Sequence, residues 1–260
     1  VDAYEQAIWL NQDDVESQRN HGIALNKLGR GDEALESLRR ALARKPGDPD
    51  AIYNFGLACE SLGKPQEAIQ ALRETVRINA QHADAWHHLG IAYEQVKNVR
   101  EAAESHRQAT LVKPDFTEAY EHLGADYRQI GQLQEAMQAW RQVARLKAED
   151  PEAYIQLGAI SRDMGRPQEA IERFRQALRL RPDDARAYTE LGILYSTTGR
   201  AQDAVDALGQ AVRIDPRQSV AWRTLGDTYL AASLNAEAAD VFQRALRIDP
   251  RDQNSYRGYG

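Results

Sequence analysis

Histidine and carboxylate residues spaced four apart are the arrangement in this sequence that comes nearest to a chemical site. Asp84 precedes His88 by four residues, and Glu118 precedes His122 by the same interval. On a helix this spacing places each pair on one face, and imidazoles and carboxylates both bind divalent metals. His87 would point about 100° away around the helix. Because no third ligand accompanies the pairs, we interpret them as surface electrostatics and predict no metal and no cofactor.

Catalytic motifs are missing from the sequence. It contains no HExxH, no Walker-type glycine loop, no GxSxG and no dinucleotide fingerprint. Cys59 is the single cysteine, so neither an internal disulfide nor a multi-thiolate zinc site can form. Its inward position predicts an inert, buried side chain. We therefore predict that the chain is not an enzyme.

The composition excludes further classes of protein. With 42% hydrophobic and 28% charged residues, the 260-residue chain can bury a core. The formal net charge of −6 argues against a nucleic-acid partner. The sequence has neither an apolar run of about 18 residues nor a signal-peptide pattern, so no membrane partner is expected within it. The compartment is not indicated, and a cytoplasmic location is the default expectation.

A strict period organises the chain. A series of glycines recurs at a constant interval, and an alanine follows each of these glycines by twelve residues. Such self-similarity indicates a repeat protein. The glycines stand 34 residues apart, at Gly22, Gly56, Gly90, Gly124, Gly158, Gly192 and Gly226.

The period divides the chain into one array, 1–260, of seven full repeats. Residues 1–14 read as the second helix of a partial repeat, and 253–260 as the start of a further one, with Tyr256 and Tyr259 at the first apolar positions. The full repeats are 15–48, 49–82, 83–116, 117–150, 151–184, 185–218 and 219–252.

Each repeat reads as two helices. Apolar positions fall at 4, 7, 8 and 11 of a repeat and again at 20, 24 and 27, the spacing of a helix face. Glycine at position 15 can end the first helix, and proline at position 32 stops the second. Positions 8 and 20 are small because the two helices cross there. In the third repeat the apolar series is Trp86, Leu89, Gly90, Tyr93, Ala102, His106 and Ala109.

This pattern of Trp/Tyr, Leu, Gly and Tyr, followed by Ala, Phe/Tyr, Ala and Pro, resembles the tetratricopeptide repeat over essentially the whole chain. Gln18 and Ile52 depart from it at the first aromatic position, and Cys59 and Ser161 at the second. The resemblance implies an all-α, right-handed superhelical solenoid of antiparallel helix pairs. First helices would line its concave side and second helices its convex side.

The candidate binding residues lie on first helices at positions that packing does not use, chiefly 2, 5, 6, 9, 12 and 13. Side chains at position 6 can all hydrogen-bond, so they could pair with the main chain of an extended peptide. The row resembles the asparagine ladder of O-linked sugar transferases only at its first two members. It reads Asn20, Asn54, His88, His122, Gln156, Glu190 and Thr224. An idle polar surface is the alternative.

The charges of the expected groove differ between its two halves. Position 2 is acidic from Glu16 to Glu152 and then changes to Arg186 and Val220. This polarity favours a partner that is basic at one end and acidic at the other. The Lys and Asn of the family's chaperone-binding carboxylate clamp are missing at positions 5 and 9 of the first three repeats. The candidate basic residues of the second half are Arg128, Arg162, Arg186 and Arg223.

These features favour a non-enzymatic scaffold that binds a protein or peptide partner in the concave groove. Both ends cut through repeats, and neither shows a solvating cap. Two alternatives therefore stay open. The chain could be the substrate-recognition arm of a larger enzyme such as a glycosyltransferase, or a structural solenoid that self-associates end to end.

Overall fold

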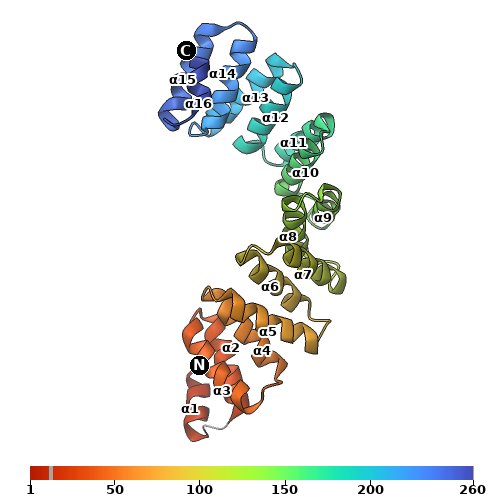
Figure 1. Cartoon of the computed structure of the whole chain (residues 1–260), viewed down its shortest axis with the longest axis vertical. Helices are drawn as coiled ribbons and strands as arrows, with labels where there is room; N and C mark the ends of the chain where they lie inside the picture. The colour runs from red at the N-terminus through yellow and green to blue at the C-terminus, as the bar shows by residue number, and fades with distance from the viewer. Residues whose placement is uncertain (12–13, 260) are drawn as a thin grey trace. The chain divides into compact units, whose positions relative to one another are not determined.

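A computed structural model describes residues 1–11 and 14–259 of the chain, and its described part contains sixteen helices and no strand (Figure 1). The predicted all-α class is therefore confirmed. No helix among these residues is both long and apolar enough to cross a membrane.

Helices alternate in pairs, and each pair begins at the residue where a predicted repeat begins. The first helices are α2 (Val15–Lys27), α4 (Pro49–Ser61), α6 (Ala83–Gln95), α8 (Thr117–Gln129), α10 (Pro151–Asp163), α12 (Ala185–Thr197) and α14 (Ser219–Ala231). The second helices are α3 (Gly31–Arg44), α5 (Pro65–Ile78), α7 (Val99–Val112), α9 (Leu133–Leu146), α11 (Pro167–Leu180), α13 (Ala201–Ile214) and α15 (Asn235–Ile248). Outside the full repeats lie α1 (Asp2–Leu10) and α16 (Gln253–Tyr259), both at the predicted places.

Local signals explain where these helices begin and end. Asp48 caps α4, its Oδ1 accepting from the main-chain N–H of Ala51 at 3.2 Å. The turn after each first helix takes a left-handed residue at position 15, such as Gly63 with φ 66°. Lys97 and Ser233 adopt the same conformation, with φ 60° and 62°, although they are not glycine. The turn geometry therefore belongs to the repeat and holds whatever residue occupies it.

The chain forms two compact units, the first from Val1 to Ala139 and the second beginning at Trp140. Within each unit the alanines of position 20 are fully buried, for example Ala68 and Ala204. Whether the two units form the single predicted array stays a prediction.

The position-8 glycines are small mainly because of position 24. A Cβ added to Gly56 would lie 2.9 Å from Leu72 Cγ, and one added to Gly192 would lie 2.4 Å from Leu208 Cγ. In these repeats the side chain at position 24 fills the space against its own first helix. Position 24 is therefore a core position of each repeat.

Candidate functional site

The side chains at position 6 are half-buried in all seven repeats. They are therefore neither core residues nor fully exposed. In three repeats the side chain at position 6 contacts position 12 of the preceding repeat, 28 residues earlier, and in a fourth repeat the main chain at position 6 does so. We call this row the inter-repeat ladder, and its pairs are Asn26–Asn54, Glu60–His88, Glu94–His122 and Arg162–Glu190.

The spacing of the histidines predicted pairs within one helix, whereas the ladder pairs each histidine with a residue of the preceding repeat. His88 Nδ1 lies 3.1 Å from Glu60 Oε2, and His122 Nδ1 lies 2.9 Å from Glu94 Oε1. The carboxylate that each histidine contacts therefore comes from the preceding repeat, and not from Asp84 or Glu118 on its own helix. Asn26 Nδ2 donates to the main-chain carbonyl of Asn54 at 2.7 Å in the same register.

The other position-6 residues make contacts closer in sequence. Asn20 Oδ1 accepts from Arg19 Nε at 3.2 Å. Gln156 Nε2 donates to Glu152 Oε1 at 2.8 Å, and Thr224 Oγ1 donates to the Val220 carbonyl at 2.9 Å. These side chains are thus partly engaged within the chain, and their contact with a peptide stays a prediction.

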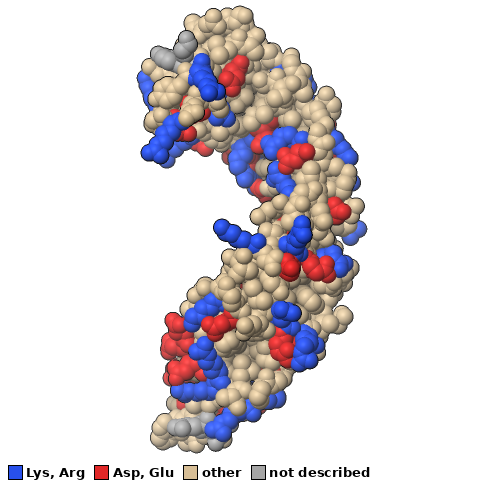
Figure 2. All heavy atoms as spheres, in the orientation of Figure 1, with Lys and Arg blue, Asp and Glu red and all other residues tan. Residues whose placement is uncertain are grey.

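Ion pairs within the second unit engage its candidate arginines. Arg162 pairs with Glu190, Arg186 Nη2 lies 2.7 Å from Glu152 Oε2, and Arg223 Nη1 lies 3.4 Å from Asp252 Oδ1. Acidic and basic side chains accordingly lie side by side in many places on the visible face (Figure 2). Arg128, in the first unit, is half-buried. The basic character that the sequence predicted for the second half is therefore largely balanced by neighbouring carboxylates.

A hollow on the first helices of the first unit brings several predicted groove positions together. Burial raises the pKa of Tyr53, whose ring stacks at 4.5 Å between centroids on His82. His82 in turn caps α6, its Nδ1 accepting from the Ala85 N–H. The hollow combines apolar and polar groups on α2 and α4. It is lined by Ile23, Asn26, Lys27, Asp50, Tyr53, Asn54, Leu57, Ser61 and His82.

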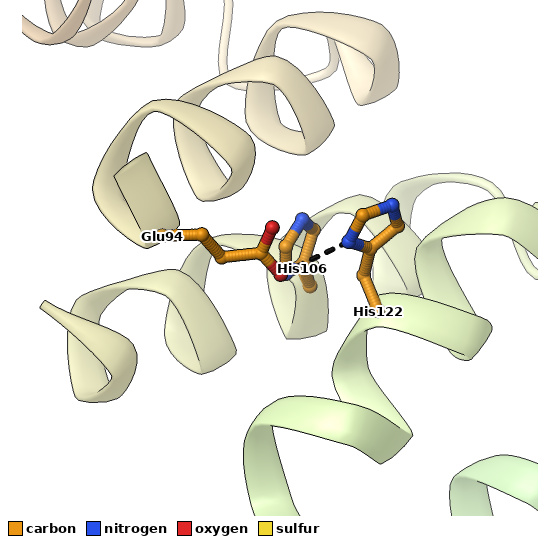
Figure 3. A group of neighbouring side chains, drawn as sticks. All are labelled: Glu94, His106 and His122. Atoms are coloured by element: carbon orange, nitrogen blue, oxygen red, sulfur yellow. Dashed lines mark hydrogen bonds and ion pairs between the residues drawn. The ribbon is translucent and has the colours of Figure 1, made fainter. Parts of the chain in front are cut away.

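A second group of polar side chains lies between α6, α7 and α8. His106, on α7, is completely buried, and its Nδ1 lies 2.8 Å from Oδ2 of Asp126 on α8. Figure 3 shows the His106 ring beside the contact between Glu94 and His122. Ligand atoms of these last three residues all lie within 4.8 Å of one another. His106 thus supplies the third ligand that the sequence analysis did not find.

Sequence reasoning missed this group because it assigned His106 to the apolar face of its helix. Position 24 is otherwise an apolar or aromatic residue, and position 10 is charged only at Asp126. The departures at these two positions are the signal that the sequence offers. The structure shows that the two residues contact each other. His87 was expected to point away, yet it is buried and its ring centroid lies 5.3 Å from that of His106 and 5.2 Å from that of His122.

Burial and neighbouring charges shift the pKa values of this group in opposite directions. Burial, together with the Glu94 carboxylate, raises the pKa of Asp126 to about 8. Burial also lowers the pKa of His106 to about 4, with His122 adding to the effect. The hydrogen bond with Glu94 raises the pKa of His122. These shifts favour the uncharged form of the buried His106–Asp126 pair, whereas the hydrogen bond between Glu94 and His122 favours the charged form of His122.

Cys59 is completely buried, as predicted, and burial raises the pKa of its thiol to about 11. A thiol at this pKa is almost entirely protonated at neutral pH and is a poor nucleophile.

The structure also shows hollows on the second-helix side, which sequence reasoning did not single out. In the second unit, the ring of Tyr195 receives a hydrogen bond at its hydroxyl from Arg175 Nε and lies under the guanidinium of Arg200. Tyr188 and Asp206 line the same hollow. Positions 4, 11 and 23 line a similar hollow in the third repeat, with Trp86, Tyr93 and Ser105.

The helix pairs and their 34-residue period define a tetratricopeptide repeat protein. The chain belongs to the tetratricopeptide family described as the Cilia and flagella-associated protein 70 C-terminal domain, which it matches over residues 24–257. The family resemblance seen in the sequence is thereby confirmed. No curated protein matches the chain significantly.

Solved structures share the fold at low sequence identity. The C-terminal part of a TPR repeat-containing protein from Cytophaga hutchinsonii has a TM-score of 0.79 at 15% identity, covering 93% of this chain and 99% of that one. A tetratricopeptide repeat protein from Parabacteroides merdae has a TM-score of 0.65 at 17% identity, covering 96% and 98%. YrrB, described as a TPR protein with an unusual peptide-binding site, has a TM-score of 0.60 at 19% identity, covering 73% and 98%. Tetratricopeptide arrays are typically non-catalytic scaffolds for protein interactions.

Proposed function

We propose that the chain is an interaction scaffold that binds an extended segment of a partner protein along its first helices, with the first unit supplying most of the affinity. The hollow on α2 and α4 carries this proposal, because it joins predicted groove positions of two successive repeats. YrrB is described as having an unusual peptide-binding site, which supports a peptide as the kind of ligand.

The lining of the hollow determines the chemistry of the partner. Ile23, Leu57 and the ring of Tyr53 offer apolar surface to one side chain of the peptide. Asp50 is an exposed carboxylate and suits a lysine or arginine. The Asn54 side-chain oxygen can accept from a main-chain N–H. The expected segment therefore combines a basic and an apolar residue in an extended conformation.

The second unit has less charge to offer a partner. Arg162, Arg186 and Arg223 are already paired with carboxylates of the chain. An acidic end of the peptide would have to compete with these internal pairs, so we expect it to add little affinity. The roles predicted for Gln156, Glu190 and Thr224 stay proposals on the same basis.

Selection of linear peptides from a display library on the full chain tests the proposal. We expect the selected peptides to share a basic and an apolar residue, and Asp50→Lys combined with Asn54→Ala to weaken their binding at least tenfold, or about 1.4 kcal/mol. Asp206→Lys is the matched control, because it reverses one charge in the second-helix hollow of the other unit. Loss of binding in the control alone would move the site to the second-helix side and contradict the proposal.

End-to-end self-association is a second candidate, because α1 leaves large apolar side chains exposed. Trp9 is 80% exposed and Leu10 is 76% exposed, and burial of such surface favours association. Sedimentation velocity over a dilution series tests this candidate. A mass that falls on dilution in the native chain, but not in Trp9→Ser, would support it, whereas a constant monomer mass would remove it. A role as the recognition arm of a larger enzyme stays a hypothesis.

A further inference from the structure

We propose that Glu94, His106 and His122 form a binding site for a divalent transition-metal ion, of which Zn²⁺ is the best fit, at the junction of the third and fourth repeats. One ligand atom of each residue lies within 4.8 Å of the others. The three residues come from α6, α7 and α8, so the site is assembled only when both repeats are folded and stacked (Figure 3). This site is separate from the peptide-binding hollow and does not depend on the proposed function.

The repeat pattern shows that this junction departs from ordinary packing. The equivalent pair one repeat earlier is Leu72 and Ala92, which are fully buried in one hydrophobic cluster. At the junction of the third and fourth repeats the same two positions hold His106, which is 0% exposed, and Asp126, which is 2% exposed. Burying polar groups is costly unless they gain partners, so apolar residues would serve packing better. A ligand that needs imidazole and carboxylate donors explains both departures.

The donor set selects the class of metal. Two imidazoles and one carboxylate form the set that zinc and other transition metals accept, whereas Mg²⁺ and Ca²⁺ prefer oxygen ligands alone. Tetrahedral Zn²⁺ with bonds of about 2.0–2.1 Å places its ligand atoms roughly 3.4 Å apart. Separations of up to 4.8 Å can close to this value through side-chain rotation.

The surroundings supply the outer contacts that metal ligands usually have. The Asp126 carboxyl group lies 2.8 Å from His106 Nδ1, where it can fix the ring or complete the coordination as a fourth ligand. His87 adds a further imidazole, itself buried, beside both ligand rings, and its Nδ1 has no hydrogen-bond partner among the described residues.

Binding should clamp the third and fourth repeats together. His122 Nδ1 now lies 2.9 Å from Glu94 Oε1, and the metal would replace this single hydrogen bond with a bond to each of the two groups.

Calorimetric titration of the metal-free full chain with Zn²⁺ is the first test. We expect one ion to bind per chain and to raise the melting temperature, with Mg²⁺ giving no effect. His122→Ala should weaken binding by more than the roughly 10–100-fold that loss of an outer contact costs. His88→Ala is the matched control, since His88 occupies the same position and contacts Glu60 in the same way, but its junction holds Leu72 and Ala92.

A second variant keeps the test decisive if His122→Ala folds poorly. The double variant His106→Leu with Asp126→Ala places at these two positions the residues found one repeat earlier. It should therefore fold at least as well as the native chain and lose zinc binding. Substitution by Co²⁺ should give visible absorption bands of nitrogen and oxygen coordination in the native chain alone. Absence of both binding heat and thermal shift in the native chain would overturn the proposal. So would equal zinc affinity in the native chain and the double variant.

Discussion

The junction between the second and third repeats and the junction between the third and fourth use the same positions in opposite ways. Leu72 and Ala92 make the first an apolar contact, whereas His106 and Asp126 make the second a buried hydrogen bond of 2.8 Å. Both pairs are almost wholly buried. The comparison teaches that the repeat sets the environment of a position, while the residue placed there determines whether the junction is only packed or can also bind a ligand and titrate.

Truncation of an ordinary position-24 residue should give the largest effect. Phe174 is completely buried, and its ring would lie 2.9 Å from a Cβ at Gly158. We expect Phe174→Ala to lower the free energy of unfolding in urea by about 3–5 kcal/mol, because it leaves a cavity. His106→Leu fills the same position and should cost less, because it leaves only Asp126 without its hydrogen-bond partner. A larger loss in His106→Leu than in Phe174→Ala would contradict this ranking.

Removal of one partner of the polar pair should give the next largest effect. Asp126→Ala leaves Nδ1 of the buried His106 without its partner, and we expect a loss of about 1–3 kcal/mol. The double variant His106→Leu with Asp126→Ala should recover this loss or exceed native stability. A double-mutant cycle measured by urea denaturation checks the coupling, and additive effects would contradict the pairing.

The same pair predicts a loss of stability at alkaline pH in the metal-free protein. The pKa of Asp126 in the fold is about 8, above its ordinary 3.8, so its contribution is lost as pH rises through about 8. Burial lowers the pKa of His106 to about 4, which has the opposite effect on stability. Below pH 6.5 this effect offsets the contribution of Asp126. The raised pKa of His122 also makes the free energy of unfolding fall as the pH rises. We expect the free energy of unfolding to fall by about 2 kcal/mol between pH 6.5 and 8.

The double variant provides the control for this pH dependence. It lacks both Asp126 and His106, so its free energy of unfolding should fall much less over the same range. If the fall were unchanged, another group would be responsible for it.

The smallest effect concerns the turn rather than the junction. Lys97 takes φ 60° at the position where Gly63 takes 66°. Lys97→Gly should therefore stabilise the third repeat by about 1 kcal/mol or less, since glycine adopts this conformation without strain. Gly63→Ala should destabilise the second repeat by a similar amount. The midpoint of urea unfolding reports both changes, and a loss of stability in Lys97→Gly would contradict the interpretation.

The helices could be predicted from the sequence because their signals are local. The position-8 glycines and the turn glycines act within one repeat, and capping residues such as Asp48 act on the helix that follows directly, so one period contains the information. The contacts between repeats could not be predicted in the same way. Glu60 and His88 are 28 residues apart, and only the packing of one helix pair on the next brings them together.

The candidate site was therefore only partly accessible to sequence reasoning. Position 6 is half-buried, for example at Asn54 and His122, and its contact with a peptide stays a prediction. The carboxylate partners of His88 and His122 were assigned to the wrong helix. His106 was counted as an apolar-face residue, and Asp126 was not considered, because nothing in one sequence tells that positions 24 and 10 of successive repeats meet.

The inter-repeat ladder has a consequence for how such a chain can be rearranged. In the second and third repeats, one half of a pair faces the repeat before and another half faces the repeat after. The third repeat, for example, presents His88 to Glu60 and Glu94 to His122. If the fifth repeat were spliced in ahead of the third, Arg162 would meet His88, and neither side chain would find the carboxylate that it contacts now. The ladder thus specifies the order of the modules, so duplication or shuffling of repeats must preserve neighbours as well as the common fold.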